Sequence, residues 1–361
     1  MLYYLRREPG FYKRLTMLAL PLVLQNLITT SLGFVDTFMV GLLGDYELSA
    51  VTAANAPIFL IQVIIFGLMS GLTILVSQYW GKQDMAAINR CMGFAMYVGL
   101  LITALTALVL YVFPHQVLSL VTNNATLVEM GAPYLKIVGI SYVFNAVSSV
   151  YVSMQRSAEN PSLGMKIFAC SMLLNTFLNY CLIFGKFGAP ALGITGAAIA
   201  TLTARIAEFA LVALYAAFSR RVPLMPGLLL RPGTATARSF IRYATPVLVN
   251  ESLWGLGTTV MTAILGHMAD SADMLAAYTI MGNIDKFTTV SCFGLAGATA
   301  VILGKSIGEG LPKQRIYDLS WCLLLVSFLL GVGLAAVLAA ALPTLFIPYL
   351  YPLFSLSPLA T

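Results

Sequence analysis

Long apolar stretches recur along this chain, and they constrain its fold more than any other feature. A helix needs about 20 mostly apolar residues to cross the hydrocarbon core of a bilayer. Only 9% of the residues are charged and 59% are hydrophobic, whereas a soluble domain has roughly 25% charged residues. The chain is therefore predicted to be an all-α polytopic membrane protein. We expect nine spanning helices, near residues 15–43, 50–77, 92–113, 130–154, 162–185, 192–218, 240–265, 275–303 and 317–342.

The basic residues predict the orientation of these helices. Lysine and arginine cluster before the first span and in every second loop, and the opposite loops carry only Lys186. Because basic loops stay on the cytoplasmic side, we expect a cytoplasmic N-terminus and a multi-pass protein of the cytoplasmic (inner) membrane. The apolar run at 15–43 is too long for the h-region of a cleavable signal peptide, which has about 7–15 residues.

Several classes of function are disfavoured by what the sequence lacks. The five cysteines form no CxxC pair, and His115 and His267 lie in expected loops, so we expect neither a metal centre nor a disulfide framework. No nucleophile–base set is evident, so a membrane enzyme is not expected and no catalytic residue is assigned. We also expect no organic cofactor and no nucleic-acid partner.

Two stretches of the chain are repeated. The segment RYATPVLVNESLWGLG (242–257) aligns with LALPLVLQNLITTSLG (18–33), and FGLAGATAVILGKSIGEG (293–310) aligns with FGLMSGLTILVSQYWGKQD (66–84) at a nearly constant offset. Gly81 then matches Gly308. Both copies follow a basic segment, so they have the same orientation. Parallel repeats of this kind occur in secondary transporters, whose binding sites lie near the middle of the membrane.

A series of motifs also resembles one family. Their order along the chain is similar to that in the multidrug and toxic compound extrusion (MATE) transporters. The motifs are ALPLVLQN…VDTFMVGLLG…LSAVTAAN, ILVSQYWGKQD, QRSAENPSLGM, LLNTFLNYCLIFG and GITGAAIAT. The resemblance implies a monomer with two six-helix lobes in membrane lipid, which exchanges Na⁺ or H⁺ for organic cations. Residues 1–220 would form the first lobe. Residues 221–361 would form an incomplete second lobe of about three helices that lacks the last three.

Asp36, inside the first apolar stretch, is the strongest candidate for a functional residue. Ionisable groups within spans are rare and usually face a bundle interior or a wet cavity. Asp36 shares a helical face with Gly33, which would let another helix or a water molecule approach. The family resemblance favours an ion-coupling role for Asp36 and for Asn175 and Asn179, with Thr201 a weaker candidate. The alternative is a set of interhelical hydrogen bonds without a role in transport.

The second lobe offers further candidates. Glu251 is followed one turn later by Trp254, and a carboxylate beside an indole ring suits a cation. The alternative is a packing acid. Asp285 is adjacent to Lys286 and could line a cavity, and a Na⁺ ion could bind at Asp36 or at Glu251. For Arg205 and Glu208, at i and i+3, we favour a local ion pair.

Three functions are compatible with these features. The first is cation-coupled antiport of organic cations or drugs out of the cell, with Na⁺ or H⁺ as the coupling ion. The second is a lipid-linked oligosaccharide flippase of the same wider superfamily, which should line its cavity with basic residues that hold a pyrophosphate. The third is a membrane receptor or assembly protein without transport, which needs a soluble docking domain. The acidic character of Asp36 and Glu251 favours the first.

Overall fold

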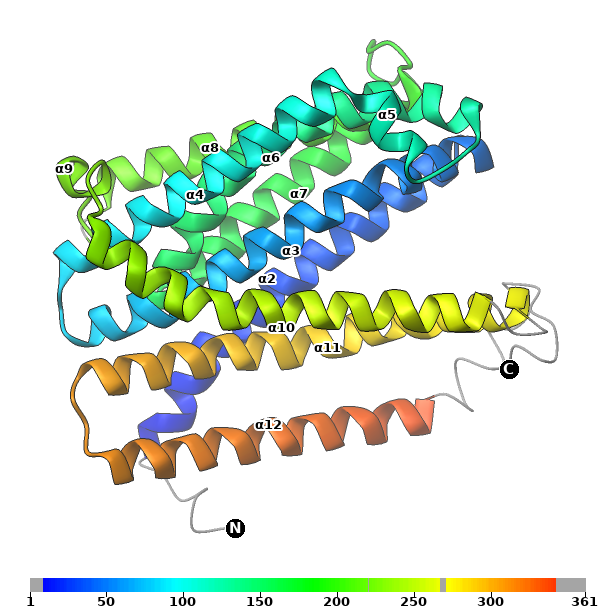
Figure 1. Ribbon diagram of the computed structural model, residues 1–361. Coiled ribbons are helices and arrows are strands. Elements are labelled where there is room, and N and C mark those ends of the chain that lie inside the picture. Colours follow the sequence, from blue (N-terminus) through cyan, green and yellow to red (C-terminus); the bar gives the residue numbers. More distant parts are fainter. Residues whose placement is uncertain (1–8, 220, 267–270, 342–361) are drawn as a thin grey trace. The chain divides into compact units, whose positions relative to one another are not determined.

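Helices make up almost all of the regular structure (Figure 1). The computed structural model describes residues 9–219, 221–266 and 271–341, and no β-strand occurs within these ranges. Two short helices, α5 (Pro114–Ser119) and α9 (Pro226–Leu229), accompany the long ones. The long helices of the described part are α2 (Pro9–Gly41), α3 (Asp45–Gly81), α4 (Met85–Val112), α6 (Ala125–Ser157), α7 (Pro161–Phe184), α8 (Gly193–Phe218), α10 (Thr234–Gly266), α11 (Ser271–Gly308) and α12 (Lys313–Ala341).

These long helices coincide with the nine expected spans. Eight helices among the described residues are long and apolar enough to cross a membrane, and α10 is not one of the eight. Its apolar sequence is interrupted by Asn250 and Glu251 and by two consecutive threonines at 258 and 259, which lower its mean hydropathy. Several helices also continue beyond the apolar stretches. For example, Asp84 caps α4 by accepting a hydrogen bond from the Ala87 amide at 2.9 Å, as an N-cap residue does.

The chain divides into two compact units. One unit contains Ile28–Leu248 and Ala300–Gly310. In this unit α6 packs against α3, α4, α7 and α8, around fully buried side chains such as Leu72, Leu135 and Met154. The buried apolar faces explain why these helices form a bundle and not independent spans.

The other unit contains the described residues within Met1–Leu27, Val249–Thr299 and Leu311–Thr361. There α2 and α11 lie in close contact, because Gly294 faces the backbone of Val23. The Tyr12 hydroxyl lies 4.0 Å from the buried sulfur of Cys322 on α12. The division into lobes at residues 1–220 and 221–361 stays a prediction.

Two glycines that correspond in the sequence repeat meet at the ends of α3 and α11. A Cβ atom on Gly81 would overlap the carbonyl oxygen of Lys305, and a Cβ atom on Gly308 would overlap the carbonyl oxygen of Gln78. Gln78 and Lys305 are themselves matched by the repeat, so the contact is reciprocal, as in a two-fold interface. The backbones of the two copies can approach this closely only because neither glycine carries a side chain.

Candidate ion-coupling site

Asp36 lies in the C-terminal part of α2 and is half-buried. Its neighbour on the same face is Gly33, and no atom lies within 4 Å of the position that a Cβ on Gly33 would occupy. No helix therefore packs against Gly33 among the described residues, and the open space is compatible with the approach of a water molecule. The Thr37 hydroxyl instead donates to the Gly33 carbonyl oxygen at 2.8 Å, a side-chain bond within the same helix.

The four polar residues predicted for the first lobe form one continuous row. The amide of Asn179 donates to Asp36 Oδ1 at 2.5 Å and to Asn175 Oδ1 at 3.1 Å. Asn175 in turn donates to the Thr201 hydroxyl oxygen at 3.4 Å. The row joins α2, α7 and α8, and Asn175 and Asn179 are buried. The i, i+4 spacing places both asparagines on the same face of α7.

One oxygen atom within the row has no partner among the described residues. Asn179 uses its nitrogen for both hydrogen bonds, and its buried Oδ1 has no hydrogen-bond partner among the described residues. A buried polar atom left unpaired costs about 1–3 kcal/mol. Hard cations take oxygen ligands, and a carboxylate beside an amide oxygen supplies two. The arrangement can therefore hold a small cation, or a proton on the carboxylate.

An ion pair on α8 sets the charge near this row. Arg205 Nη1 donates to Glu208 Oε2 at 2.7 Å, and the Glu208 side chain is completely buried. The local pair expected from the i, i+3 spacing is therefore present. Arg205 also interacts electrostatically with Asp36. Because Glu208 already balances Arg205, a negative charge is left in excess whenever Asp36 is ionised.

The candidates of the second lobe are not joined in the same way. Trp254 is 58% exposed, Glu251 is half-buried, and Asp285 and Lys286 are exposed. Among the described residues, no hydrogen bond or ion pair links the carboxylates of Glu251 and Asp285 to a partner. Their roles stay predictions.

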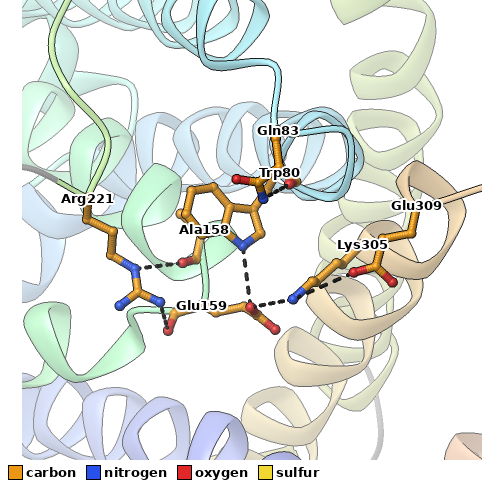
Figure 2. A network of polar contacts seen from close by, with 7 residues as sticks. All are labelled: Trp80, Gln83, Ala158, Glu159, Arg221, Lys305 and Glu309. Atoms are coloured by element: carbon orange, nitrogen blue, oxygen red, sulfur yellow. Dashed lines mark hydrogen bonds and ion pairs between the residues drawn. The ribbon is translucent and has the colours of Figure 1, made fainter.

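A second polar network surrounds Glu159, in the short loop between α6 and α7 (Figure 2). Its Oε2 atom accepts hydrogen bonds from Lys305 Nζ at 2.8 Å and from the Trp80 indole at 3.3 Å. Arg221 donates to the carbonyl oxygens of Ala158 and Glu159, each at 3.0 Å. The network ties four separate segments of the chain together.

Sequence reasoning missed this network, although one signal was available. Glu159 is the acidic residue of a loop flanked by Arg156 and Lys166, in a chain whose loops on that side are strongly basic. An acid in such surroundings is expected to be paired. Nothing in the sequence indicates that its partner is Lys305.

Comparison with known families decides what kind of protein this is. A model of the MatE family matches residues 21–181 and 246–357, which is more than half of the chain. The chain belongs to the MatE family. Members of this family are transporters, so this MATE protein is a transporter and not an enzyme.

Two curated relatives match most of the chain. The probable multidrug resistance protein NorM of Thermotoga maritima is 25% identical over 343 residues, which cover 92% of this chain and 71% of the relative. The multidrug resistance protein PmpM of Pseudomonas aeruginosa is 26% identical over 335 residues, which cover 91% of this chain and 67% of the relative.

A solved structure supports the fold. A MATE protein in the bent conformation matches with a TM-score of 0.83 at 18% identity, covering 100% of this chain and 79% of that chain. The two-lobe helical transporter fold expected from the sequence is thereby confirmed.

Proposed function

We propose that this MATE protein exports organic cations in exchange for Na⁺ or H⁺, and that Asp36 carries the coupling ion. The observation that supports this most is the unpartnered Oδ1 of Asn179, buried beside the Asp36 carboxylate. The names of the relatives, which are multidrug resistance proteins, support drugs as the exported molecules. The proposal includes a monomer in the cytoplasmic membrane with its N-terminus in the cytoplasm.

In this proposal, the charge of Asp36 couples ion binding to the conformational change. With the site empty, Asp36 holds the negative charge that Arg205 and Glu208 leave uncompensated. Burial disfavours this charged form, whereas a bound Na⁺ or proton removes the excess. An ion can shift a conformational equilibrium only by binding one state better than the other. A site whose access to water differs between the two states satisfies that condition.

The row of amides gives the site its geometry. Asn175 accepts a hydrogen bond from Asn179 and donates one to Thr201, and these two bonds hold the Asn179 amide in the orientation that leaves its oxygen unpaired. In the second lobe, Glu251 and the ring of Trp254 are proposed to hold the organic cation, and Asp285 is proposed to line its path.

Export of a fluorescent cationic dye from proteoliposomes tests this function. Na⁺ and pH gradients are imposed separately, and Asp36→Asn is compared with the wild type. We expect the variant to lose gradient-driven export by about tenfold or more, within the usual range of coupling energies. Glu129→Gln is the matched control, because the Glu129 side chain is 77% exposed on α6. Export by Asp36→Asn with the wild-type dependence on the gradient would overturn the proposal.

A further inference from the structure

The segment between α8 and α10 is fixed to the bundle and is not a free tether. The buried side chain of Asn89, on α4, accepts a hydrogen bond from the Met225 amide at 2.9 Å and donates to the Pro223 carbonyl oxygen at 3.1 Å. The Tyr97 hydroxyl donates to the Leu230 carbonyl oxygen at 3.2 Å. Figure 1 shows α9, within this segment, at the end of α4.

Close contacts strengthen this attachment. A Cβ on Gly93 would overlap the carbonyl oxygen of Leu229, so the segment lies directly on the backbone of α4. The start of α10 is also held, because the ring of Phe240 is buried and lies 5.2 Å from the ring of Phe94. Residues 221–244 are therefore held against the bundle at several points on their inward side.

The outward side of the same residues is basic and apolar. Arg231, Arg238 and Arg242 are exposed and form no ion pair with any other described residue. Leu230 and Ile241, 67% and 57% exposed, lie between them in the sequence. No aspartate or glutamate occurs between Ser219 and Asn250, so nothing in this stretch neutralises the arginines. We call these five residues the linker surface.

The linker surface is adjacent to two membrane spans. It follows the span that ends at Phe218, and its segment rests on α4, which is itself long and apolar enough to be a span. A basic surface with interspersed apolar side chains next to such spans suits the headgroup region of a bilayer. Guanidinium groups bind phosphate through two parallel hydrogen bonds.

We propose that the linker surface binds the headgroups of anionic phospholipids, with Arg231, Arg238 and Arg242 on the phosphates and Leu230 and Ile241 against the acyl chains. The rigid attachment through Asn89 and Tyr97 keeps the arginines in place, which lowers the entropy lost on binding. The proposal does not depend on the transport function, since it concerns the lipid contacts of this face alone.

Lipid-dependent thermal unfolding of the 361-residue chain in detergent micelles tests the proposal. Phosphatidylglycerol and phosphatidylcholine are titrated separately, and bound lipids are counted by native mass spectrometry. We expect phosphatidylglycerol to raise the unfolding temperature more than phosphatidylcholine does. The triple variant R231Q/R238Q/R242Q should lose at least half of that difference and bind fewer phosphatidylglycerol molecules.

Two further variants make the result specific. The control K166Q/K313Q/R315Q removes three other exposed basic residues and should respond as the wild type does. The variant R231K/R238K/R242K keeps the charges and should retain a response to phosphatidylglycerol. An unchanged response of the glutamine variant, an equal loss in the control, or an equal stabilisation of the wild type by inorganic phosphate would overturn the proposal.

Discussion

Two acidic residues of the same unit, Asp36 and Glu159, show how differently a partly buried carboxylate can be used. Glu159 accepts from a lysine at 2.8 Å and from an indole at 3.3 Å, so its charge is balanced. Asp36 accepts from a neutral amide, and the arginine that interacts with it is already paired with Glu208. Both carboxylates are hydrogen-bonded. They differ because a positively charged group of the protein balances the charge of Glu159 but not that of Asp36.

This difference suggests how each carboxylate is used. A carboxylate whose counter-ion is part of the protein holds segments of the chain together, as Glu159 does for the loop after α6 and the end of α11. A carboxylate without such a counter-ion leaves room for a cation from outside the protein. The predictions that follow test whether charge balance is the correct criterion.

The largest loss of stability is expected from Glu208→Gln, which changes the balance of charge around Asp36. The completely buried Glu208 is the ion-pair partner of Arg205, and removing one partner of a buried pair costs about 3–5 kcal/mol. Unfolding in detergent micelles should show this loss. The double variant R205Q/E208Q removes both charges and should recover part of the stability. A double variant no more stable than Glu208→Gln would show that the charge left on Arg205 is not the cause.

A second test removes the unpartnered oxygen from the site. Asn179→Leu should abolish the stabilisation that we expect Na⁺ to give the wild type. A ligand at 100 times its Kd contributes about 2.7 kcal/mol, so the change in unfolding temperature is measurable. Ser171→Ala, on the same helix, removes a hydrogen bond to the Ala204 carbonyl oxygen and should leave the ion-dependent shift intact. A shift retained by Asn179→Leu would remove this asparagine from the site.

Glu159→Gln is expected to give a smaller loss of stability and no loss of ion binding. Hydrogen bonds to charged groups contribute about 1.5–3 kcal/mol, and the uncharged amide oxygen of the variant can still accept from Lys305 and Trp80, so only part of that free energy should be lost. The stability of the wild type should therefore fall with added salt more than that of the variant. If Glu159→Gln instead eliminated the ion-dependent shift, the contrast between the two acids would be wrong.

The smallest effect is expected from Glu309→Gln. Glu309 directly follows α11 and is 41% exposed, and its Oε1 atom lies 3.8 Å from Lys305 Nζ, four residues earlier. Exposed pairs at this spacing contribute about 0.3–0.5 kcal/mol. In chemical denaturation, the free energy of unfolding of the variant should lie within about 0.3–0.5 kcal/mol of that of the wild type. A loss as large as that of Glu159→Gln would show that Lys305 depends equally on both acids.

The sequence predicts the helices and the first-lobe row well because both follow from local spacing. The period of 3.6 residues places Asn175 and Asn179 on one face, and the apolar stretches mark the spans. The position of Asp36 within such a stretch is enough to single it out. Its hydrogen bond to Asn179 joins two of the residues that the sequence singles out.

The parts that could not be predicted depend on contacts between distant segments. The pairing of Glu159 with Lys305 spans 146 residues of sequence, and Glu159 has a positive φ of 60°, which no helical pattern indicates. The open space beside Gly33 depends on where other helices lie, and helical spacing carries no information about that. The fixed position of the linker depends on Asn89, whose sequence context is that of an ordinary helical residue.

The meeting of Gly81 and Gly308 has a consequence for how the two copies of the repeat can diverge. Where the two copies do not touch each other, a substitution in one copy faces its own surroundings, and the copies can change independently. At this crossing each copy forms the surroundings of the other, because each glycine faces a backbone carbonyl of the opposite copy. A larger residue accepted in one half would require a compensating shift in the other half. The two halves of the chain are therefore expected to keep their ancestral likeness longest at this point.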